Sequence, residues 1–261
     1  MTKLILTGLL FLLCGGEAFG LTLVQKKNCP ASGAVTTFTC TFTSPTPSGN
    51  TIVVQAGGYI NTCCSSGQIN ATDSASNTYA LVKNQFQSLA GLGHSTLSVF
   101  CATASTTATL TVTATMASAP SDPTFLVINI LEYSGLTCTS DGTPVGTSLA
   151  QGSSISACDP GNFTSTNAND LIIAAINYSG SFNTQTVTSP WVVELSSASN
   201  SPLVYADNTV SSAGVYDPKW TFTATTFSAG CLTAALQLAV TGNGKVSVGG
   251  KTVMGGKFVT Q

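Results

Sequence analysis

The segment Thr109-Leu110-Thr111-Val112-Thr113-Ala114-Thr115 alternates hydroxyl and apolar side chains at every position. Successive side chains of an extended strand point to opposite faces, so this alternation predicts a strand with one buried and one solvated face. Residues 35–43 alternate in this way for much of their length, and residues 221–224 repeat the pattern. Threonine suits the outer face of such strands, because its β-branched side chain packs well on a pleated surface.

Other segments are almost continuously apolar, which predicts central strands covered on both faces. They are residues 52–54, 125–131, 171–176 and 232–240. The last is long and alanine-rich enough to suggest a helix as the alternative. We favour a strand, because Cys231, Thr233 and Gln237 do not define one polar helical face.

Clusters of Ser, Pro and Gly separate these segments, as at residues 44–49 and 118–123. About ten or more short strands with such spacing predict an all-β fold. We expect an antiparallel two-sheet sandwich, jelly-roll or immunoglobulin-like and stapled by disulfides. No linker divides it, so residues 21–241 form one predicted domain. Because the ends of compact domains are commonly close, we expect the strand at Phe38 to lie near that at Leu236.

The first twenty residues predict a signal peptide over residues 1–20. Lys3 precedes an apolar run at residues 4–13, and Ala18-Phe19-Gly20 offers small residues for cleavage before Leu21. The run is too short to span a bilayer comfortably, so we expect no transmembrane span. Lipidation at Cys14 is the alternative. Export predicts a secreted or cell-surface location.

The last residues differ in composition from the rest of the chain. A Gly-Lys pair opens each of three six-residue units, at Gly244, Gly250 and Gly256. So few short repeats cannot bury one another's apolar faces. We therefore expect residues 242–261 to form a tail, and residues 244–261 to mediate attachment or self-association as an added edge strand. A frayed terminus without a role is the alternative.

Cysteine content supports export, because an even number of cysteines in an exported chain predicts disulfides. The spacing leaves the connectivity open. Cys138 with Cys158 is the best single pair, because these two bracket a polar loop, and the adjacent Cys63 and Cys64 are expected to have different partners. The eight cysteines expected to be bonded are Cys29, Cys40, Cys63, Cys64, Cys101, Cys138, Cys158 and Cys231.

Charge and composition exclude several function classes. Charged residues make up 7% of the chain, the net charge is −2, and arginine is absent. A chain without basic patches or guanidinium groups is not expected to bind nucleic acid. His94 is the single histidine and no Cys-x-x-Cys occurs, so we expect no metal and no cofactor.

Four segments, taken in order, carry a resemblance to a known group of proteins. They are Gly49-Asn50-Thr51-Ile52-Val53-Val54, Asp73-Ser74-Ala75-Ser76-Asn77-Thr78-Tyr79, Glu132-Tyr133-Ser134-Gly135-Leu136 and Asn169-Asp170-Leu171-Ile172-Ile173-Ala174. In these segments the chain resembles exported bacterial β-sandwich modules of mostly unassigned function. The resemblance implies a secreted sandwich, sometimes attached to larger surface proteins, and it implies no catalytic residue. The many cysteines depart from the pattern of that group.

Paired carboxylates are the enzymatic hypothesis to consider, because glycoside hydrolysis needs two of them facing each other across a groove. Glu132 and Glu194 are the glutamates of the predicted domain, and Asp73, Asp170 and Asp207 are further candidates. Simpler interpretations place Glu132 at a strand end, and Asp73 and Asp170 in turns. A calcium site is the alternative for this turn, with Asp73 and Asn77 as oxygen ligands of the ion.

Glycan binding without catalysis needs exposed aromatic faces and hydroxyl or amide partners. The weak candidates are Tyr59, Tyr178, Tyr205 and Tyr216, whereas Trp191 and Trp220 are expected in the core. The sequence therefore predicts a non-enzymatic secreted or cell-surface sandwich for adhesion or structural display, with weak glycan binding as an added activity. Its expected partner is an extracellular glycan or a surface protein. The alternative is a glycan-active hydrolase that uses paired carboxylates.

Overall fold

The computed structural model describes residues 20–30, 35–60, 69–89, 93–116, 124–149, 155–180, 184–197, 203–239, 246–248 and 251–253. These residues form antiparallel strands and turns, which confirms the all-β class. Most of residues 232–240, for which a helix was the alternative prediction, belongs to a strand, β17 (Trp220–Leu238). Within the described ranges, no helix is long and apolar enough to cross a membrane. Nearly all of the expected signal peptide, with Cys14, lies outside the described residues.

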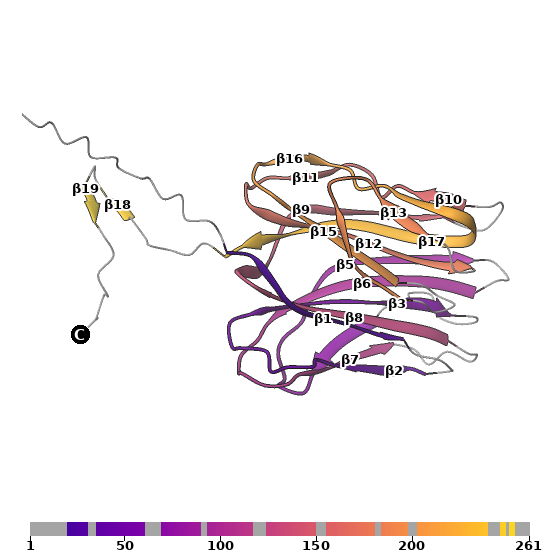
Figure 1. The fold of residues 1–261 in the computed structure, drawn as a ribbon, viewed down its shortest axis with the longest axis horizontal. Helices are drawn as coiled ribbons and strands as arrows, with labels where there is room; N and C mark the ends of the chain where they lie inside the picture. Colours follow the sequence, from indigo (N-terminus) through magenta and orange to yellow (C-terminus); the bar gives the residue numbers. More distant parts are fainter. Residues whose placement is uncertain are drawn as a thin grey trace, which may run out of the picture.

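A five-stranded sheet forms the middle layer of the body (Figure 1). Its two central strands are buried on both faces: Ile52 and Val54 face one neighbouring layer, and Val53 and Leu131 face the other. This double burial is the physical reason for the continuous apolar runs in the sequence. The strand order is β1 (Thr22–Pro30), β8 (Thr124–Ser134), β3 (Thr51–Ile60), β6 (Gly93–Thr103) and β5 (Ala80–Leu89).

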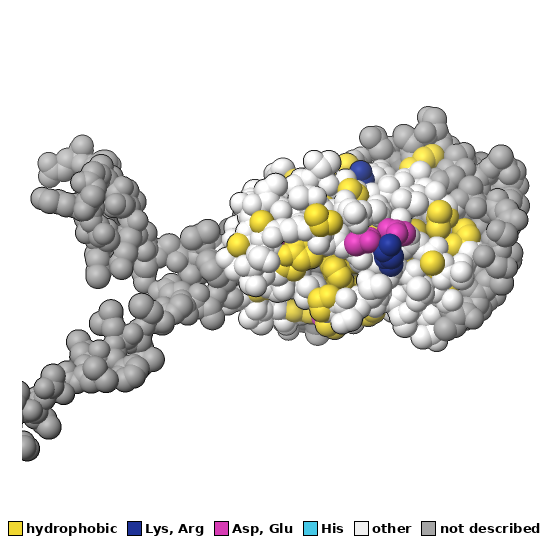
Figure 2. Space-filling view, turned by 90° about the horizontal axis from the view of Figure 1, so that it is seen from above, with side chains coloured by type: hydrophobic (Ala, Val, Ile, Leu, Met, Phe, Trp, Pro, Cys, Tyr) yellow, Lys and Arg dark blue, Asp and Glu magenta, His cyan; other side chains and the backbone are white. Residues whose placement is uncertain are grey.

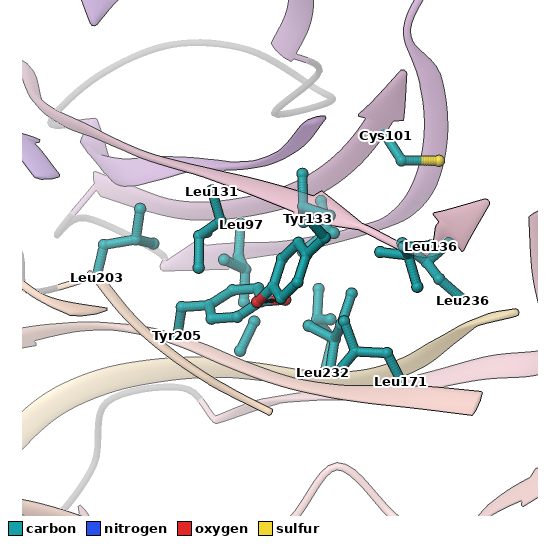
Figure 3. Close-up of a cluster of buried hydrophobic side chains, with 14 of the residues drawn as sticks. Leu97, Cys101, Leu131, Tyr133, Leu136, Leu171, Leu203, Tyr205, Leu232 and Leu236 are labelled. Carbon is teal, nitrogen blue, oxygen red and sulfur yellow. Dashed lines mark hydrogen bonds between the residues drawn. The ribbon is translucent and has the colours of Figure 1, made fainter. Parts of the chain in front are cut away.

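A seven-stranded sheet packs on one face of the middle layer. Leu131 and Tyr133 of the five-stranded sheet meet Leu171, Tyr205 and Leu232 of the seven-stranded sheet in a shared core (Figure 3). The strand order is β10 (Ile155–Cys158), β17, β12 (Asp170–Gly180), β15 (Leu203–Val210) and β14 (Val192–Ser196), and β9 (Leu136–Leu149) and β13 (Gln185–Val187) also pair with β17.

A three-stranded sheet covers the opposite face of the middle layer. It consists of β2 (Thr37–Thr41), β7 (Thr111–Met116) and β4 (Ile69–Asp73), in that order. Val112 and Ala114 of the alternating segment point into the core beneath this sheet, as the alternation predicts. The antiparallel sandwich is thus confirmed, and the structure adds a third layer to the two that the sequence suggested.

The ends of the body meet at Gly135. The Ala239 amide donates to the Gly135 carbonyl at 2.8 Å, and a Cβ at Gly135 would lie 2.7 Å from the Gly20 carbonyl oxygen. The expectation that Phe38 lies near Leu236 is wrong, because these residues belong to the two outer layers with the five-stranded sheet between them. That expectation overlooked β1, which precedes the strand at Phe38.

Two further strand pairs complete the described chain. β11 (Phe163–Ser165) and β16 (Gly214–Tyr216) pair on the outer side of the seven-stranded sheet, where Phe163 packs on Ile172 and Ala235. β18 (Val246–Val248) and β19 (Lys251–Val253) of the Gly-Lys tail pair with each other and, within the described residues, with no strand of the body. The rest of residues 242–261 lies outside the description.

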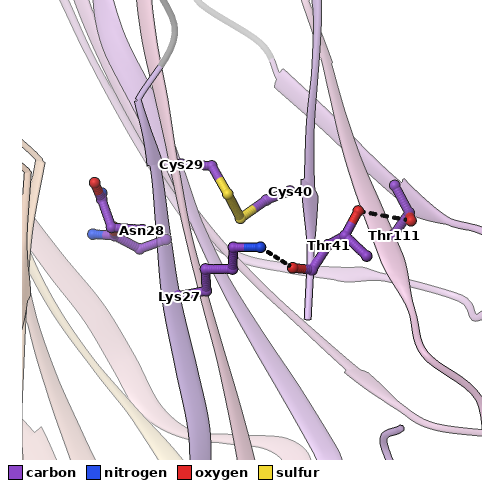
Figure 4. Close-up of a disulfide and its surroundings, with 7 residues drawn as sticks. Lys27, Asn28, Cys29, Cys40, Thr41 and Thr111 are labelled. Atoms are coloured by element: carbon purple, nitrogen blue, oxygen red, sulfur yellow. Dashed lines mark hydrogen bonds between the residues drawn. A yellow bond between two sulfur atoms is a disulfide. The ribbon is translucent and has the colours of Figure 1, made fainter. Parts of the chain in front are cut away.

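Among the described residues, three disulfides join different layers or segments of the body. Cys29–Cys40 links β1 of the middle layer to β2 of the three-stranded sheet (Figure 4). Cys101–Cys138 links β6 of the middle layer to β9 of the seven-stranded sheet. Cys158–Cys231 ties β10 to the centre of β17.

The predicted Cys138–Cys158 pair is therefore wrong. Both cysteines are near each other in the sequence, but Cys138 packs toward the core between the two large sheets and Cys158 packs in the core on the outer side of the seven-stranded sheet. Cys63 and Cys64 lie outside the described residues. Structural disulfides are typical of oxidising compartments, so the three bonds support an extracellular or secreted environment.

Candidate functional site

A fully buried carboxylate, that of Glu132, gathers three polar side chains from distant parts of the chain. Its Oε2 accepts hydrogen bonds from Gln25 Nε2 at 2.5 Å and from Thr46 Oγ1 at 3.0 Å. Its Oε1 accepts a hydrogen bond from Asn50 Nδ2. The site therefore places a buried hydroxyl and a partly buried carboxamide against one carboxylate oxygen. We call Glu132, Gln25, Thr46 and Asn50 the Glu132 cluster.

The strand register builds this cluster. Gln25 of β1 lies opposite Glu132 of β8 in the antiparallel pair, and side chains opposite each other on one face are neighbours. Thr46 belongs to the connection between β2 and β3, and its backbone bridges to Ala108. The Gln25 amide is also fixed by Ser44, whose N–H donates to Gln25 Oε1 at 3.1 Å and whose carbonyl accepts from Nε2 at 3.0 Å.

Glu194, the other predicted glutamate, lies elsewhere. It is the extra residue of a bulge in β14 and forms an ion pair with Lys26 Nζ at 2.7 Å. Gln25 and Lys26 are consecutive in β1, so their side chains point to opposite faces of the five-stranded sheet. Glu132 and Glu194 therefore lie on opposite sides of that sheet and cannot flank one glycosidic bond.

The structure instead brings Glu194 near Asp207 of β15. Tyr133 from the middle layer donates a hydrogen bond to Asp207 Oδ2 and lies 3.3 Å from the Tyr205 hydroxyl (Figure 3 shows the two rings meeting). Burial raises the pKa of Asp207 to about 6; the Tyr133 hydrogen bond and Lys26 oppose this rise, and the Glu194 charge adds to it. Burial also raises the pKa of Tyr133 and Tyr205 well above the ordinary value, so both stay protonated donors.

Asp170, another predicted carboxylate, pairs with Asp141 beneath the β11–β16 strands. Ser165 Oγ bridges the two, at 2.6 Å from Asp170 Oδ2 and 3.0 Å from Asp141 Oδ2. Burial raises the pKa of Asp170 to about 6, and the neighbouring Asp141 adds to the rise. Burial opposes ionisation of Asp141 too, but hydrogen bonds from Thr166 and Asn167 outweigh it and hold that pKa well below its usual range.

Asp73 closes a turn, as predicted. Its Oδ1 accepts from the backbone N–H groups of Ala75 and Asn77, and its Oδ2 accepts from Asn77 Nδ2 and the Tyr79 hydroxyl. Ser76 in this turn has a left-handed backbone, with φ at 58°. Both carboxylate oxygens, which a calcium site would need as ligands, therefore already accept two hydrogen bonds each. In the described part of the chain, no group of three or more His, Cys, Asp or Glu could hold a metal.

Among the candidate tyrosines whose side chains are described, two are buried and one is partly exposed, so these three form no shared platform for a sugar. Tyr178 and Tyr205 are fully buried, which contradicts a role for them in binding a glycan at the surface. Tyr216 is partly exposed, and its hydroxyl donates to the Ser212 carbonyl. The side chain of Tyr59 lies outside the described residues. Trp220 is fully buried, as expected for a core residue.

The surface is poor in charge. Figure 2 shows one face on which a few acidic and basic side chains lie among neutral polar and apolar ones. Lys219 forms two of the described ion pairs at the surface. Its Nζ lies 2.8 Å from Asp159 Oδ2 and 3.1 Å from Asp217 Oδ2. Neutral hydroxyl and amide groups therefore carry most of the solvation of this surface.

Comparison with known proteins identifies no relative. No family model, no curated protein and no solved structure matches the chain.

Proposed function

We propose that this protein is a non-enzymatic secreted or cell-surface β-sandwich that serves adhesion or structural display. The observation that carries the proposal is the placement of the disulfides. Cys29–Cys40 and Cys101–Cys138 each join the middle layer to a different outer layer. Cross-links of this kind stabilise a domain where reducing agents and chaperones are absent, as outside the cell.

The described carboxylates support the same proposal, because they form hydrogen bonds and ion pairs that connect strands or sheets. Glu132 and Asp73 accept hydrogen bonds that fix connections between strands. Asp207 and Glu194 contact residues of the neighbouring sheet, Tyr133 and Lys26. Such groups hold layers together, and a display module needs a rigid body more than it needs a reactive site. Weak glycan binding would use Tyr216, which is partly exposed, or Tyr59, whose side chain lies outside the described residues.

The test is to express the full chain in an exporting host and to follow where it goes. We expect surface protease to digest it on intact cells, and cells that display it to adhere better than control cells to surfaces coated with glycans or extracellular proteins. A variant with Cys101 and Cys138 both replaced by serine provides the matched control for fold integrity. Retention of the wild-type protein inside the cell, or unchanged adhesion, would refute the proposal.

A glycan-active hydrolase is the second candidate, and one observation favours it. Asp207 has a pKa raised to about 6 near Glu194, and an acid of raised pKa beside a second carboxylate is the pattern of an acid–base pair. Release of reducing ends from a panel of polysaccharides tests it, with Asp207→Asn and Glu194→Gln as variants. Hydrolysis that both substitutions abolish would replace the display proposal.

A further inference from the structure

We propose that the Glu132 cluster forms a covalent cross-link, in which Thr46 and Gln25 condense to an intramolecular ester with Glu132 as the base. The geometry points to this reaction because a buried hydroxyl and a partly buried carboxamide contact the same oxygen of one buried carboxylate. The proposal goes beyond display and does not depend on it.

The nucleophile and its base are in hydrogen-bond contact. Thr46 Oγ1 donates to Glu132 Oε2 at 3.0 Å, within the range over which a base activates a hydroxyl. Both residues have no exposed surface. Exclusion of water from these two side chains strengthens the interaction of the carboxylate with the hydroxyl proton.

The acceptor is held in place on both of its heteroatoms. The backbone N–H of Ser44 donates to Gln25 Oε1 at 3.1 Å, and this is the oxygen that gains negative charge when the carbonyl carbon is attacked. Gln25 Nε2 contacts Glu132 Oε2 at 2.5 Å, the same oxygen that receives the Thr46 proton. One carboxylate oxygen therefore contacts both the group that loses a proton and the group that leaves with one. Asn50 fixes the orientation of this carboxylate through its other oxygen.

The reaction balances without an oxidant, a reductant or a cofactor. A bond forms between Thr46 Oγ1 and Gln25 Cδ, and the hydroxyl proton moves to Glu132. The bond between Cδ and Nε2 then breaks, and Glu132 returns the proton to the departing nitrogen. One ammonia molecule leaves, and Glu132 is restored to its starting state.

A second amide–hydroxyl pair in the same fold lacks the carboxylate. Gln85 Nε2 donates to Ser148 Oγ at 2.6 Å, and Ser148 Oγ donates to the Phe86 backbone carbonyl at 3.4 Å. Without a carboxylate to accept the hydroxyl proton, this pair is not expected to react. It provides the matched control for the Glu132 cluster.

The product would tie the edge strand β1 to the connection between β2 and β3. Cys29–Cys40 already joins β1 to β2, and reduction breaks that bond. An ester at Gln25 would hold the same edge strand under reducing conditions. The N-terminal strand would then stay attached to the body when the disulfides are opened.

The test is the intact mass of the full chain, purified, reduced and alkylated. We expect a mass lower by one ammonia than the sequence requires, and a protease digest in which the peptide of Gln25 is joined to that of Thr46. Hydroxylamine should separate the two peptides by cleaving the ester. Thr46→Val, which keeps the shape and removes the hydroxyl, and Glu132→Gln should have the full mass. Thr46→Ser and the control Ser148→Ala should keep the loss.

A wild-type protein with the full mass would overturn the proposal, whatever the variants do. An ammonia loss that persists in Thr46→Val, or that maps to residues other than Gln25, would also overturn it. Folding of each variant is checked by its far-ultraviolet circular dichroism. The wild-type measurement alone decides the outcome, so a variant that fails to fold does not leave the question open.

Discussion

Asp207→Asn should change how the stability of the protein depends on pH. The carboxyl of Asp207 has a pKa of about 6 in the folded protein, against an ordinary value of 3.8. At a pH below the ordinary pKa, Asp207 is protonated in both the folded and the unfolded chain, and its contribution to stability is fully present. As the pH rises toward 6, the unfolded chain ionises first, so stability is lost until the folded carboxyl also ionises.

The magnitude follows from the size of the shift. One pKa unit corresponds to about 1.4 kcal/mol, so a rise of about two units corresponds to about 3 kcal/mol. This is an upper value, because solvent reaches part of the Asp207 side chain and screens the neighbouring charges. Asparagine does not ionise, and its carbonyl still accepts the Tyr133 hydrogen bond. The variant should therefore gain stability relative to wild type by up to about 3 kcal/mol between about pH 4 and about pH 7.

The assay is urea unfolding of the disulfide-intact protein at a series of pH values, followed by tryptophan fluorescence. The control is Asp159→Asn, because Asp159 is exposed and its pKa is lowered by Lys219. Its difference from wild type should stay constant across this pH range. A difference between Asp207→Asn and wild type that does not change with pH would refute the argument that burial holds the proton on Asp207.

Three further predictions follow from backbone and cross-link geometry. Gly142→Ala should destabilise the fold by about 1–3 kcal/mol, because φ is 63° and the new Cβ would lie 2.2 Å from the Thr164 carbonyl oxygen. Gly161→Ala, also at positive φ but with open space around it, should cost less in the same denaturation assay. Replacing both Cys101 and Cys138 by serine should lower the free energy of unfolding by about 2–5 kcal/mol, and equal stability would contradict the role of this disulfide. Deleting residues 242–261 should shift the melting temperature by about 2–4 °C at most, because β18 pairs with β19. The deletion should also reduce self-association or attachment to cells, and much earlier unfolding would make the tail an integral part of the fold.

Strands could be predicted because their pattern is local. Alternation at residues 109–115 gives the buried face of β7, and continuous apolar runs give β3, β8 and β12. The turn at Asp73 was also predictable, since its acceptors and donors lie within six residues of one another. Such features need no knowledge of the partner strands.

The order of the layers could not be predicted. A run buried on both faces shows that two layers cover it, but it does not identify them. The strand β1 was missed because its apolar residues do not alternate: Lys26 and Lys27 are adjacent, and a bulge next to Val24 shifts the register. The sequence predicted disulfides but not their pairing, since Cys101 meets Cys138 only when the middle and seven-stranded sheets stack.

The Glu132 cluster shows this limit most clearly. Thr46 and Glu132 are 86 residues apart, and Gln25 and Glu132 are 107 apart. No local pattern distinguishes Gln25 or Thr46 from the many other polar residues of the chain. The register of β1 against β8 brings Gln25 to Glu132, and the path of the connection between β2 and β3 brings Thr46 there.

The central claim is that the body is a stack of sheets in which disulfides fasten the middle layer to the layer on each side. A peptide map of the purified, exported protein, digested without reduction, tests it most directly. The account predicts peptides that join Cys29 to Cys40, Cys101 to Cys138, and Cys158 to Cys231. A peptide that joins Cys138 to Cys158, or free thiols at these six positions, would contradict it.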